Sequence, residues 1–501
     1  MLFEAKRCLR SGVDRSVHLP NPPGEIRMSA PHRRPPIGRT AHLLAACVLL
    51  AAASACGADY DIVIEGGRVM DPESGLDAVR NVGISDGRVE LISEDALSGS
   101  RTIDARGLVV APGFVDLHRH GQHEAAYRLQ VHDGVTTGLE LELGTADVAA
   151  WYEERVGGQL VNYGVAIGHL GARAVAMGDP VTGTSGRSTR LAATPAQRAE
   201  IERLIRVGLA QGAVGIGIGA AYTPGAPMAE IAAVLGVAAQ RGVVAFIHTR
   251  NGLAGLDSTL SAAREARASL HVVHANSSGG GAVVAFLDRI RAATDEGLDV
   301  TTEAYPYAAS QALIESAVFD DWASWSDDRF QRYEWARTGE RLTRETFAVH
   351  RAEGGSVLIH SRTQDLTLAA VTSPLTMFAS DGSVGHPRGA GTFAKILGRY
   401  VREQGALDLM DALSRMTIRP ARRLEPFVPA MANKGRIRVG ADADITIFDP
   451  ETVVDRATYD NALLTSEGIE YVLVNGVVVL DGGELVEDVR PGRPITGLAT
   501  Y

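Results

Sequence analysis

Four histidines and one aspartate stand where strand-like runs of this sequence end. His118 and His120 close the first such run, His248 and His274 close the fifth and sixth, and Asp381 closes the eighth. Imidazole nitrogens and carboxylate oxygens are ligands of zinc and similar divalent ions. An ion held by them would lower the pKa of water and polarise a carbonyl group. A single histidine at a strand end is more often a packed residue, so the interpretation depends on the whole set.

The elements that must position these side chains lie between about residues 112 and 426. Strand-like runs alternate there with amphipathic helices, one of which begins with a capping pattern at Thr194, Pro195 and Gln197. Eight such alternations predict an α/β fold, a (β/α)8 TIM-like barrel whose active site lies at the carboxyl ends of the strands. The expected strands are Gly113–His120, Val135–Glu142, Val161–His169, Ala213–Gly219, Val243–Thr249, Leu270–Ala275, Val300–Tyr307 and Leu375–Asp381.

Both ends of the chain have short alternating runs separated by Gly and Asp turns, which is typical of β-hairpins. Residues 56–111 and 427–501 are therefore predicted to form one small β-sandwich domain beside the barrel of residues 112–426. Residues 317–370 contain three tryptophans and are an expected insertion that could fold over the barrel mouth.

The first 55 residues have the pattern of an export signal, with Met28 as a possible alternative start. Arginines precede a short apolar run at residues 41–53, and small residues lead directly to Cys56. We therefore expect a bacterial cell-envelope lipoprotein that faces the periplasm and contacts the membrane through a lipid anchor on Cys56. Plain secretion into the periplasm or beyond, and an uncleaved N-terminal anchor, are the alternatives.

Cysteine and charge exclude several other classes of protein. The three cysteines (Cys8, Cys47 and Cys56) all lie at the N-terminus, so the folded body that follows them has neither disulfides nor cysteine ligands. Residues 56–501 contain 41 basic and 57 acidic residues, a net charge of −16. Such a surface argues against a nucleic-acid partner.

Several motifs make the chain resemble the amidohydrolase superfamily, and within it the D-aminoacylase branch of N-acyl-D-amino-acid deacylases. By this resemblance His118, His120, His248, His274 and Asp381 are metal ligands, and Asp381 also transfers a proton from water to the leaving amine. The resemblance implies one or two divalent ions, with Zn²⁺ the first choice. The motifs are Pro112-Gly-Phe-Val-Asp116-Leu-His118-Arg-His120, Gly134-Val-Thr-Thr137, His248-Thr-Arg250, Tyr305-Pro-Tyr307, Ser380-Asp381-Gly, His386-Pro-Arg388-Gly, Gly391-Thr-Phe and Ala441-Asp-Ala-Asp444-Ile.

One ligand of these relatives must be replaced in this chain. Many of them bridge two metal ions with a carboxylated lysine or, in D-aminoacylases, with a cysteine of the second strand. The barrel has no cysteine, and its one lysine, Lys395, follows Asp381. Glu140 and Glu142 share one face of the second strand, which should face the barrel interior because two carboxylates are costly to bury among helices. Glu142, nearer the strand end, is the preferred bridging ligand and Glu140 the second choice; an internal ion pair with arginine is the alternative for either.

The resemblance also suggests residues that bind the substrate. Arg388 is the first choice for the α-carboxylate, because a guanidinium binds a carboxylate through two hydrogen bonds. Tyr305 and Tyr222 match pocket tyrosines, whereas Asn276 stands where relatives have a lysine. The sequence gives Arg250 and His169 equal claims to a place in the pocket and to a structural role.

The function expected from these residues is hydrolysis of the amide bond of small N-acyl-D-amino acids, which yields a carboxylate and a free D-amino acid. A dipeptidase and a cyclic-amide hydrolase of the hydantoinase kind are alternatives within the same class of enzyme. A non-catalytic envelope lipoprotein is the alternative from another class, and the nearly complete ligand set speaks against it.

Overall fold

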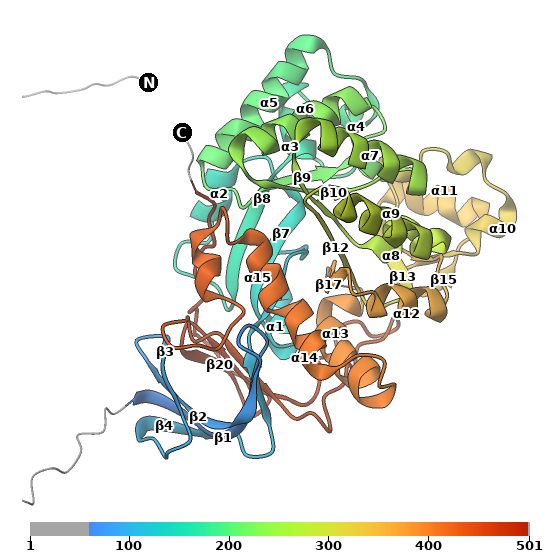
Figure 1. The fold of residues 1–501 in the computed structure, drawn as a ribbon. Coiled ribbons are helices and arrows are strands. Elements are labelled where there is room, and N and C mark those ends of the chain that lie inside the picture. Colours follow the sequence, from blue (N-terminus) through green and yellow to red (C-terminus); the bar gives the residue numbers. More distant parts are fainter. Residues whose placement is uncertain (1–59, 384, 499–501) are drawn as a thin grey trace, which may run out of the picture. The chain divides into compact units, whose positions relative to one another are not determined.

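The computed structural model describes residues 60–383 and 385–498, and a barrel of eight parallel strands lies at their centre (Figure 1). The strands run in the order β17-β12-β11-β10-β9-β8-β7-β6. A bridge between Arg119 and Gly382, with the amide of His120 donating to the Gly382 carbonyl at 2.9 Å, joins the first segment to the last. The expected (β/α)8 barrel is confirmed. Its strands are β6 (Phe114–Asp116), β7 (Val135–Thr145), β8 (Asn162–Gly168), β9 (Ile216–Gly219), β10 (Val244–His248), β11 (Ser269–Val272), β12 (Val300–Ala304) and β17 (Thr376–Phe378).

Several strands end earlier than the sequence pattern indicated. The strand β6 ends at Asp116, β11 at Val272 and β17 at Phe378. His118, His274 and Asp381 therefore lie just beyond the strands, where the backbone leaves the hydrogen-bonded ladder. The backbones of His274 and Asp381 have φ angles of 34° and 48°, in the left-handed region that non-glycine residues seldom adopt. Such strain is held in place by its surroundings and concentrates at functional sites.

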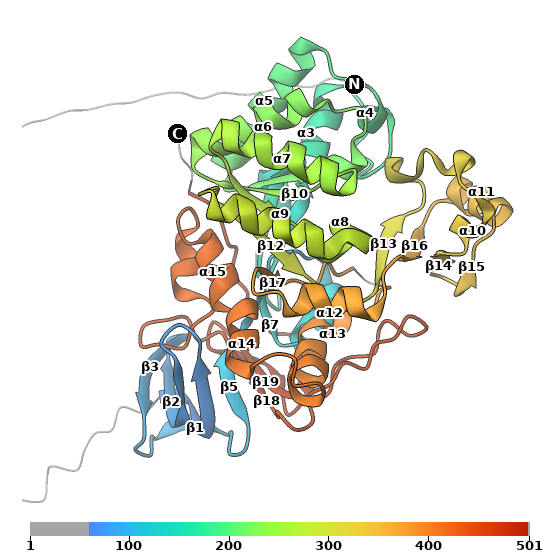
Figure 2. The same cartoon turned by 45° about the vertical axis from the view of Figure 1, so that its right-hand side comes forward.

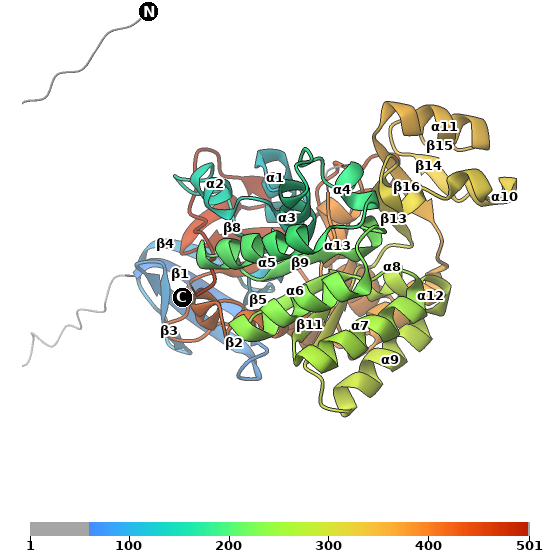
Figure 3. The same cartoon turned by 90° about the horizontal axis from the view of Figure 1, so that it is seen from above.

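Helices cover the outside of the barrel, as Figure 3 shows from above. The helix α5 begins with the expected capping box, in which Thr194 and Gln197 satisfy each other's backbone amides. Its buried face includes Ile201, Ile205 and Leu209. The helices are α1 (Glu124–His132), α2 (Val148–Glu153), α3 (His169–Ala176), α4 (Arg187–Arg190), α5 (Pro195–Ala210), α6 (Met228–Arg241), α7 (Gly252–Ala266), α8 (Ala275–Gly279), α9 (Val283–Asp295), α12 (Gln364–Thr372), α13 (Arg388–Lys395), α14 (Leu409–Met416) and α15 (Ile418–Leu424).

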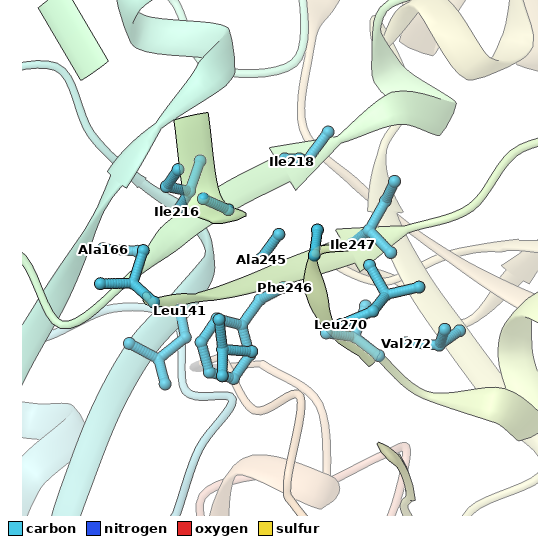
Figure 4. Packing of buried hydrophobic residues seen from close by; sticks show 14 of the residues in the cluster. Leu141, Ala166, Ile216, Ile218, Ala245, Phe246, Ile247, Leu270 and Val272 are labelled. Atoms are coloured by element: carbon cyan, nitrogen blue, oxygen red, sulfur yellow. The ribbon is translucent and has the colours of Figure 1, made fainter. Parts of the chain in front are cut away.

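Apolar side chains on both faces of the strands form the main core. Strands β8, β9 and β11 are buried almost throughout, as expected for parallel strands that helices cover. Figure 4 shows Ile216 of β9 and Phe246 of β10, both buried in this core, on opposite sides of the strands. This packing fixes the positions from which the polar strand ends project.

The two ends of the chain share one nine-stranded sheet, which confirms the predicted β unit built from both termini. Strand β5 pairs with β1 on one side and with β18 on the other, so the N-terminal and C-terminal halves are joined through the ladder. The strands are β1 (Tyr60–Asp71), β2 (Leu76–Ser85), β3 (Arg88–Ser93), β4 (Gly99–Asp104), β5 (Val109–Pro112), β18 (Ile445–Phe448), β19 (Ile469–Val474), β20 (Val477–Asp481) and β21 (Glu484–Leu485).

A separate small unit, here called the insertion, lies between β12 and β17 and projects to one side (Figure 2). Its sheet consists of β13 (Ala309–Leu313), β16 (Ser356–His360), β14 (Tyr333–Trp335) and β15 (Glu340–Arg341). The helices α10 (Asp327–Phe330) and α11 (Arg344–Glu353) cover it, and Trp325, Phe330 and Phe347 pack in its own apolar cluster.

In residues 60–383 and 385–498 no helix is both long and apolar enough to cross a bilayer. The expected export signal and Cys56 lie outside the described residues.

Candidate metal centre

Six side chains from five segments of the barrel meet at the carboxyl ends of the strands. They form two groups, and in each group every residue offers one ligand atom that lies within 4.8 Å of those of the other members. The first group is His118, His120, Glu142 and Asp381, and the second is Glu142, His248 and His274. Glu142 therefore belongs to both.

The first group consists of acceptors that face a common point. The Nδ1 atoms of His118 and His120 face carboxylate oxygens of Glu303 (2.5 Å) and Glu140 (2.6 Å), so each Nδ1 is assigned as the protonated donor. Both Nε2 atoms then present lone pairs, although they lie only 3.2 Å apart. Oε2 of Glu142 lies 3.2 and 3.1 Å from these nitrogens. Lone pairs and carboxylates gathered in this way fit a bound cation.

The electrostatics of the site agree with this geometry. Burial acts to lower the pKa of His118, but the carboxylates of Asp381, Glu303 and Glu142 together raise it well above its usual value. Burial acts to raise the pKa of Glu142, and the surrounding imidazoles hold it well below its usual range. A site that attracts a proton so strongly attracts a metal cation for the same reason.

The second group is built on the other oxygen of Glu142. Its Oε1 lies 2.6 Å from Nδ1 of His248 and 3.6 Å from Nε2 of His274. The two imidazole rings meet edge to face with centroids 4.3 Å apart. The carboxylate of Glu142 thus contacts four imidazoles, two through each oxygen. This is the arrangement expected of a ligand that two metal ions share.

Glu140, the second choice for the shared ligand, lies outside both groups. Its Oε2 accepts from Nδ1 of His120, and its Oε1 accepts from the backbone amides of Leu143 and Gly144 at 3.1 and 3.4 Å. The carboxylate therefore orients the His120 ring from behind. A carboxylate behind a ligating histidine fixes its tautomer and raises its basicity.

Glu303 of β12, which was not among the residues expected at the site, has the same role behind His118. Its Oε2 lies 3.0 Å from Nε2 of His271, whose Nδ1 lies 2.8 Å from the Thr301 hydroxyl. Burial raises the pKa of Glu303, but the imidazoles of His118 and His271 outweigh burial and bring it to about 2. Glu140 and Glu142 were identified as acidic residues inside an expected barrel strand, and Glu303 has the same kind of position in its own strand.

Asp381 is held by its neighbours on two sides. Its Oδ1 lies 3.4 Å from Nε2 of both His118 and His120. Its Oδ2 lies 2.8 Å from Nη1 of Arg388, an ionic contact without hydrogen-bond geometry. Burial raises the pKa of Asp381, and Arg388 and His118 more than compensate, so the carboxylate is ionised.

The tyrosines and Asn276 lie around this core. The ring of Tyr222 meets that of His248 edge to face at 4.8 Å. The Arg388 guanidinium lies 4.7 Å from the ring centroid of Tyr305. Asn276 is fully buried, and its amide donates to the Tyr305 carbonyl at 3.0 Å.

Arg250 and His169 are not brought into the metal groups. His169 is buried against Glu230, with Nε2 at 2.9 Å from Oε1. Arg250 donates to the Thr223 carbonyl and lines a cavity of about 230 Å³ that none of the six metal-group side chains borders. Both contacts fit the structural role that the sequence left open.

A barrel with histidines and carboxylates gathered at its strand ends is the architecture of a metal-dependent hydrolase. Residues 109–479 match the model of the amidohydrolase family, so this chain belongs to that family and the resemblance read from its motifs is confirmed.

Three relatives of known identity are similar over most of the chain. An N-acyl-D-glutamate deacylase of Alcaligenes xylosoxydans xylosoxydans is 32% identical over 492 residues, which cover 86% of this chain and 96% of that protein. The crystal structure of the Bordetella bronchiseptica N-acyl-D-glutamate deacylase, with zinc and a phosphonate inhibitor, has a TM-score of 0.76, 28% identity and coverage of 87% and 100%. A D-aminoacylase with a binuclear metal centre, described as activated by one metal and attenuated by a second, has a TM-score of 0.75, 25% identity and the same coverage.

Proposed function

We propose that this protein hydrolyses the amide bond of N-acyl-D-amino acids and releases a carboxylate and a free D-amino acid. The observation that carries the proposal is the pair of ligand groups that share Glu142 at the carboxyl ends of the strands. The named relatives, which are deacylases and an aminoacylase, support the choice of a linear amide as substrate.

We propose Zn²⁺ for these groups, with one or two ions bound. His118, His120, Glu142 and Asp381 would hold one ion, and Glu142, His248 and His274 the other. Nitrogen and oxygen donors of this kind suit zinc. A bound ion would polarise the scissile carbonyl and lower the pKa of the attacking water.

The protein's own residues would manage the proton and the orientation. The Asp381 carboxylate accepts a proton from the attacking water and gives it to the leaving amine nitrogen. Arg388 keeps that carboxylate ionised and fixes its direction through the 2.8 Å contact. Glu303 and Glu140 hold the rings of His118 and His120 in the tautomer that leaves Nε2 free for the ion.

We assign Arg388 to the α-carboxylate of the substrate, with Tyr305 and Tyr222 shaping the pocket. Arg388 is 2% exposed and stands between Asp381 and the Tyr305 ring. A carboxylate placed there would lie next to the amide that is cleaved, as it does in an N-acyl amino acid.

The test is a comparison of N-acyl-D- and N-acyl-L-amino acids, dipeptides and hydantoins as substrates of the purified mature chain with and without zinc. We expect turnover of the D series alone, its loss after chelation and its return with zinc. Turnover confined to dipeptides or cyclic amides would overturn the assignment of substrate. Full activity in metal-free protein would overturn the assignment of the metal centre.

We further propose that the mature chain begins at a lipid-modified Cys56 and is anchored in the cell envelope. The export pattern before this cysteine supports the proposal. Mass spectrometry of the native protein should find the modification at Cys56, and Cys56→Ala should release the protein from membranes. An unmodified N-terminus elsewhere would contradict the anchor.

A further inference from the structure

A groove, here called the outer groove, lies where β7 and β8 end, and none of the six metal-group side chains lines it. Its volume is about 320 Å³, within the range of sites that bind small molecules. The end of β7, the helices α2 and α3 and the segment between α3 and α4 form its walls. Its apolar lining consists of Leu143, Ala150, Trp151, Leu170, Ala174 and Val181.

The outer groove begins directly after a residue of the metal centre. Leu143, which lines the groove, is the next residue after Glu142, which belongs to both ligand groups. Between Glu140 and Thr145 the ladder with β8 is interrupted by a bulge. Bulges change the direction of side chains and are frequent next to active sites. Three residues span at most about 11 Å, so Thr145 in the groove lies within that distance of Glu142 along the chain.

One layer of apolar side chains joins the outer groove to the metal centre. Gly219, at the end of β9, leaves room for this layer. A β-carbon at this glycine would lie 2.7 Å from the Leu170 side chain, 3.0 Å from that of Tyr222 and 3.1 Å from that of Leu143. The Tyr222 ring also meets the His248 ring edge to face at 4.8 Å. The side chains that line the groove therefore contact those around the ligand groups.

The groove lies across the barrel from the residues assigned to the substrate's α-carboxylate. Tyr305 follows β12 and Arg388 follows β17. In the closed order of eight strands, β8 stands opposite β12, and β9 stands opposite β17. A trans amide places its acyl carbon and its α-carbon on opposite sides of the C–N bond. A substrate whose carboxylate lies at Arg388 and whose amide lies at the ligand groups would therefore direct its acyl chain toward the ends of β8 and β9.

The charges of the outer groove suit an uncharged, apolar group. Among the described residues that line it there is no arginine, lysine or histidine. Its acidic side chains, Asp147 and Glu154, are exposed to solvent. The groove therefore offers no cation to a carboxylate. Val181 is an apolar side chain of the wall that is 56% exposed, and an apolar ligand would remove it from water.

We propose that the outer groove binds the acyl chain of the substrate and selects N-acyl-D-amino acids with acyl chains of several methylene groups. The inference rests on the proposed function and adds to it the class of acyl group. The chain would pass from the amide over Leu143 and lie against Leu170 and Trp151. Burial of each methylene group then contributes to binding, whereas an acetyl group would not reach the groove.

The experiment measures kcat/KM of the zinc-loaded mature chain for a series of acyl lengths. The substrates are the N-acetyl, N-butanoyl, N-hexanoyl and N-octanoyl derivatives of D-glutamate and of D-leucine. We expect kcat/KM to rise by up to about 4-fold for each methylene group that enters the groove, which corresponds to about 0.8 kcal/mol. Between acetyl and octanoyl the rise should be on the order of 30-fold or more.

A150F and A149F are a matched pair of variants on α2. Ala150 lines the outer groove, whereas its neighbour Ala149 is exposed and does not line it. A phenylalanine at position 150 would occupy the space of the acyl chain. We expect the ratio of kcat/KM for octanoyl to that for acetyl substrates to fall by about 10-fold or more in A150F, because about two buried methylene groups are lost. The ratio in A149F should equal that of the wild type.

Acetyl substrates that are hydrolysed as well as or better than octanoyl substrates by the wild type would overturn the inference. Equal ratios in A150F and A149F would do the same. If A150F does not fold, V181D replaces it, since a charge on the groove wall disfavours an alkyl chain. Its control is V175D, because Val175 is 48% exposed on α3 and does not line the groove. A lower ratio in V181D than in V175D supports the inference, and equal ratios overturn it.

Failure of the proposed function has a different result. Wild-type protein that hydrolyses none of the eight substrates would refute the function as a deacylase of N-acyl-D-amino acids. Hydrolysis of the acetyl substrates without any gain from longer chains would keep that function and refute only the role of the outer groove.

Discussion

Replacing Glu142 with glutamine tests whether one carboxylate serves both ligand groups. Glu142→Gln keeps the volume of the side chain and removes one negative charge. The oxygens of Glu142 lie between 2.6 and 3.6 Å from four imidazole nitrogens, two in each group. The change should therefore weaken both metal positions together.

The size of the effect follows from the distances. The ligand atoms of each group lie within 4.8 Å of one another, so the lost charge acts over about 4 Å. At that distance, and at an effective dielectric constant of about 20, a unit charge pair is worth about 4 kcal/mol. This corresponds to about three decades in the dissociation constant of the metal. We expect a fall in metal content and in kcat, with a melting temperature close to that of the wild type in the presence of excess zinc.

Glu140→Gln is the matched control, because it also removes one negative charge, from a residue two positions before Glu142 in the sequence. Of the six metal-group side chains, Glu140 contacts His120, at the Nδ1 atom that faces away from the ligand group, and carboxylates in such positions contribute about 10- to 100-fold in metal affinity. The assay is metal content per chain in graded zinc buffers, measured beside kcat and thermal melting for both variants. Equal losses in the two variants, or full metal content and wild-type turnover in Glu142→Gln, would refute the reasoning.

Three further perturbations test other parts of the structure. Arg388→Ala should raise KM for N-acyl-D-amino acids by about two decades and also lower kcat, because Asp381 loses its 2.8 Å partner; wild-type kinetics would contradict this. Lys434→Met should lower the free energy of unfolding by about 3–5 kcal/mol in urea titrations, because the buried ammonium pairs with Asp444 at 2.7 Å and Asp442 at 3.0 Å; an unchanged midpoint would argue against the pairing. Burial raises the pKa of Asp133 to about 7 despite the hydrogen bonds from Ala394, Phe393 and Ser466. The folded state then binds more protons than the unfolded state between about pH 4 and 7, so this group's contribution to stability falls across that range by about 4 kcal/mol at most. The difference in unfolding free energy between wild type and Asp133→Asn should fall accordingly as pH rises, whereas parallel pH profiles would show that Asp133 does not titrate there.

The sequence identified the barrel and most of the ligand types because both leave local signals. Buried parallel strands are short apolar runs in the sequence. The start of α5 was predicted from the capping pattern of Thr194 and Gln197. Glu140 and Glu142 were recognised because carboxylates are rare in a buried strand. The alternation of side chains along β7 also indicated that both face the same side.

The sequence did not rank those two carboxylates by their contacts, and it missed Glu303. The choice depends on atoms that meet across the barrel. The carboxylate of Glu142 contacts His248, which lies 106 residues away in the sequence. The carboxylate of Glu140 contacts His120 and the nearby backbone amide of Leu143. The contact between Glu303 and His118 spans 185 residues. No local periodicity records such pairs.

The sequence by itself determined which chemistry the protein could perform, because the number and kind of ligands and the absence of cysteine from the barrel are properties of composition and spacing. Tertiary structure alone decided how the charges are compensated. Arg388 and Arg362 look alike in the sequence, yet one folds against Asp381 and the other against the neutral oxygens of Ser310, Tyr305 and Tyr307. The cost of a buried charge depends on what lies within a few ångströms, and closure of the barrel and the path of the insertion determine those neighbours.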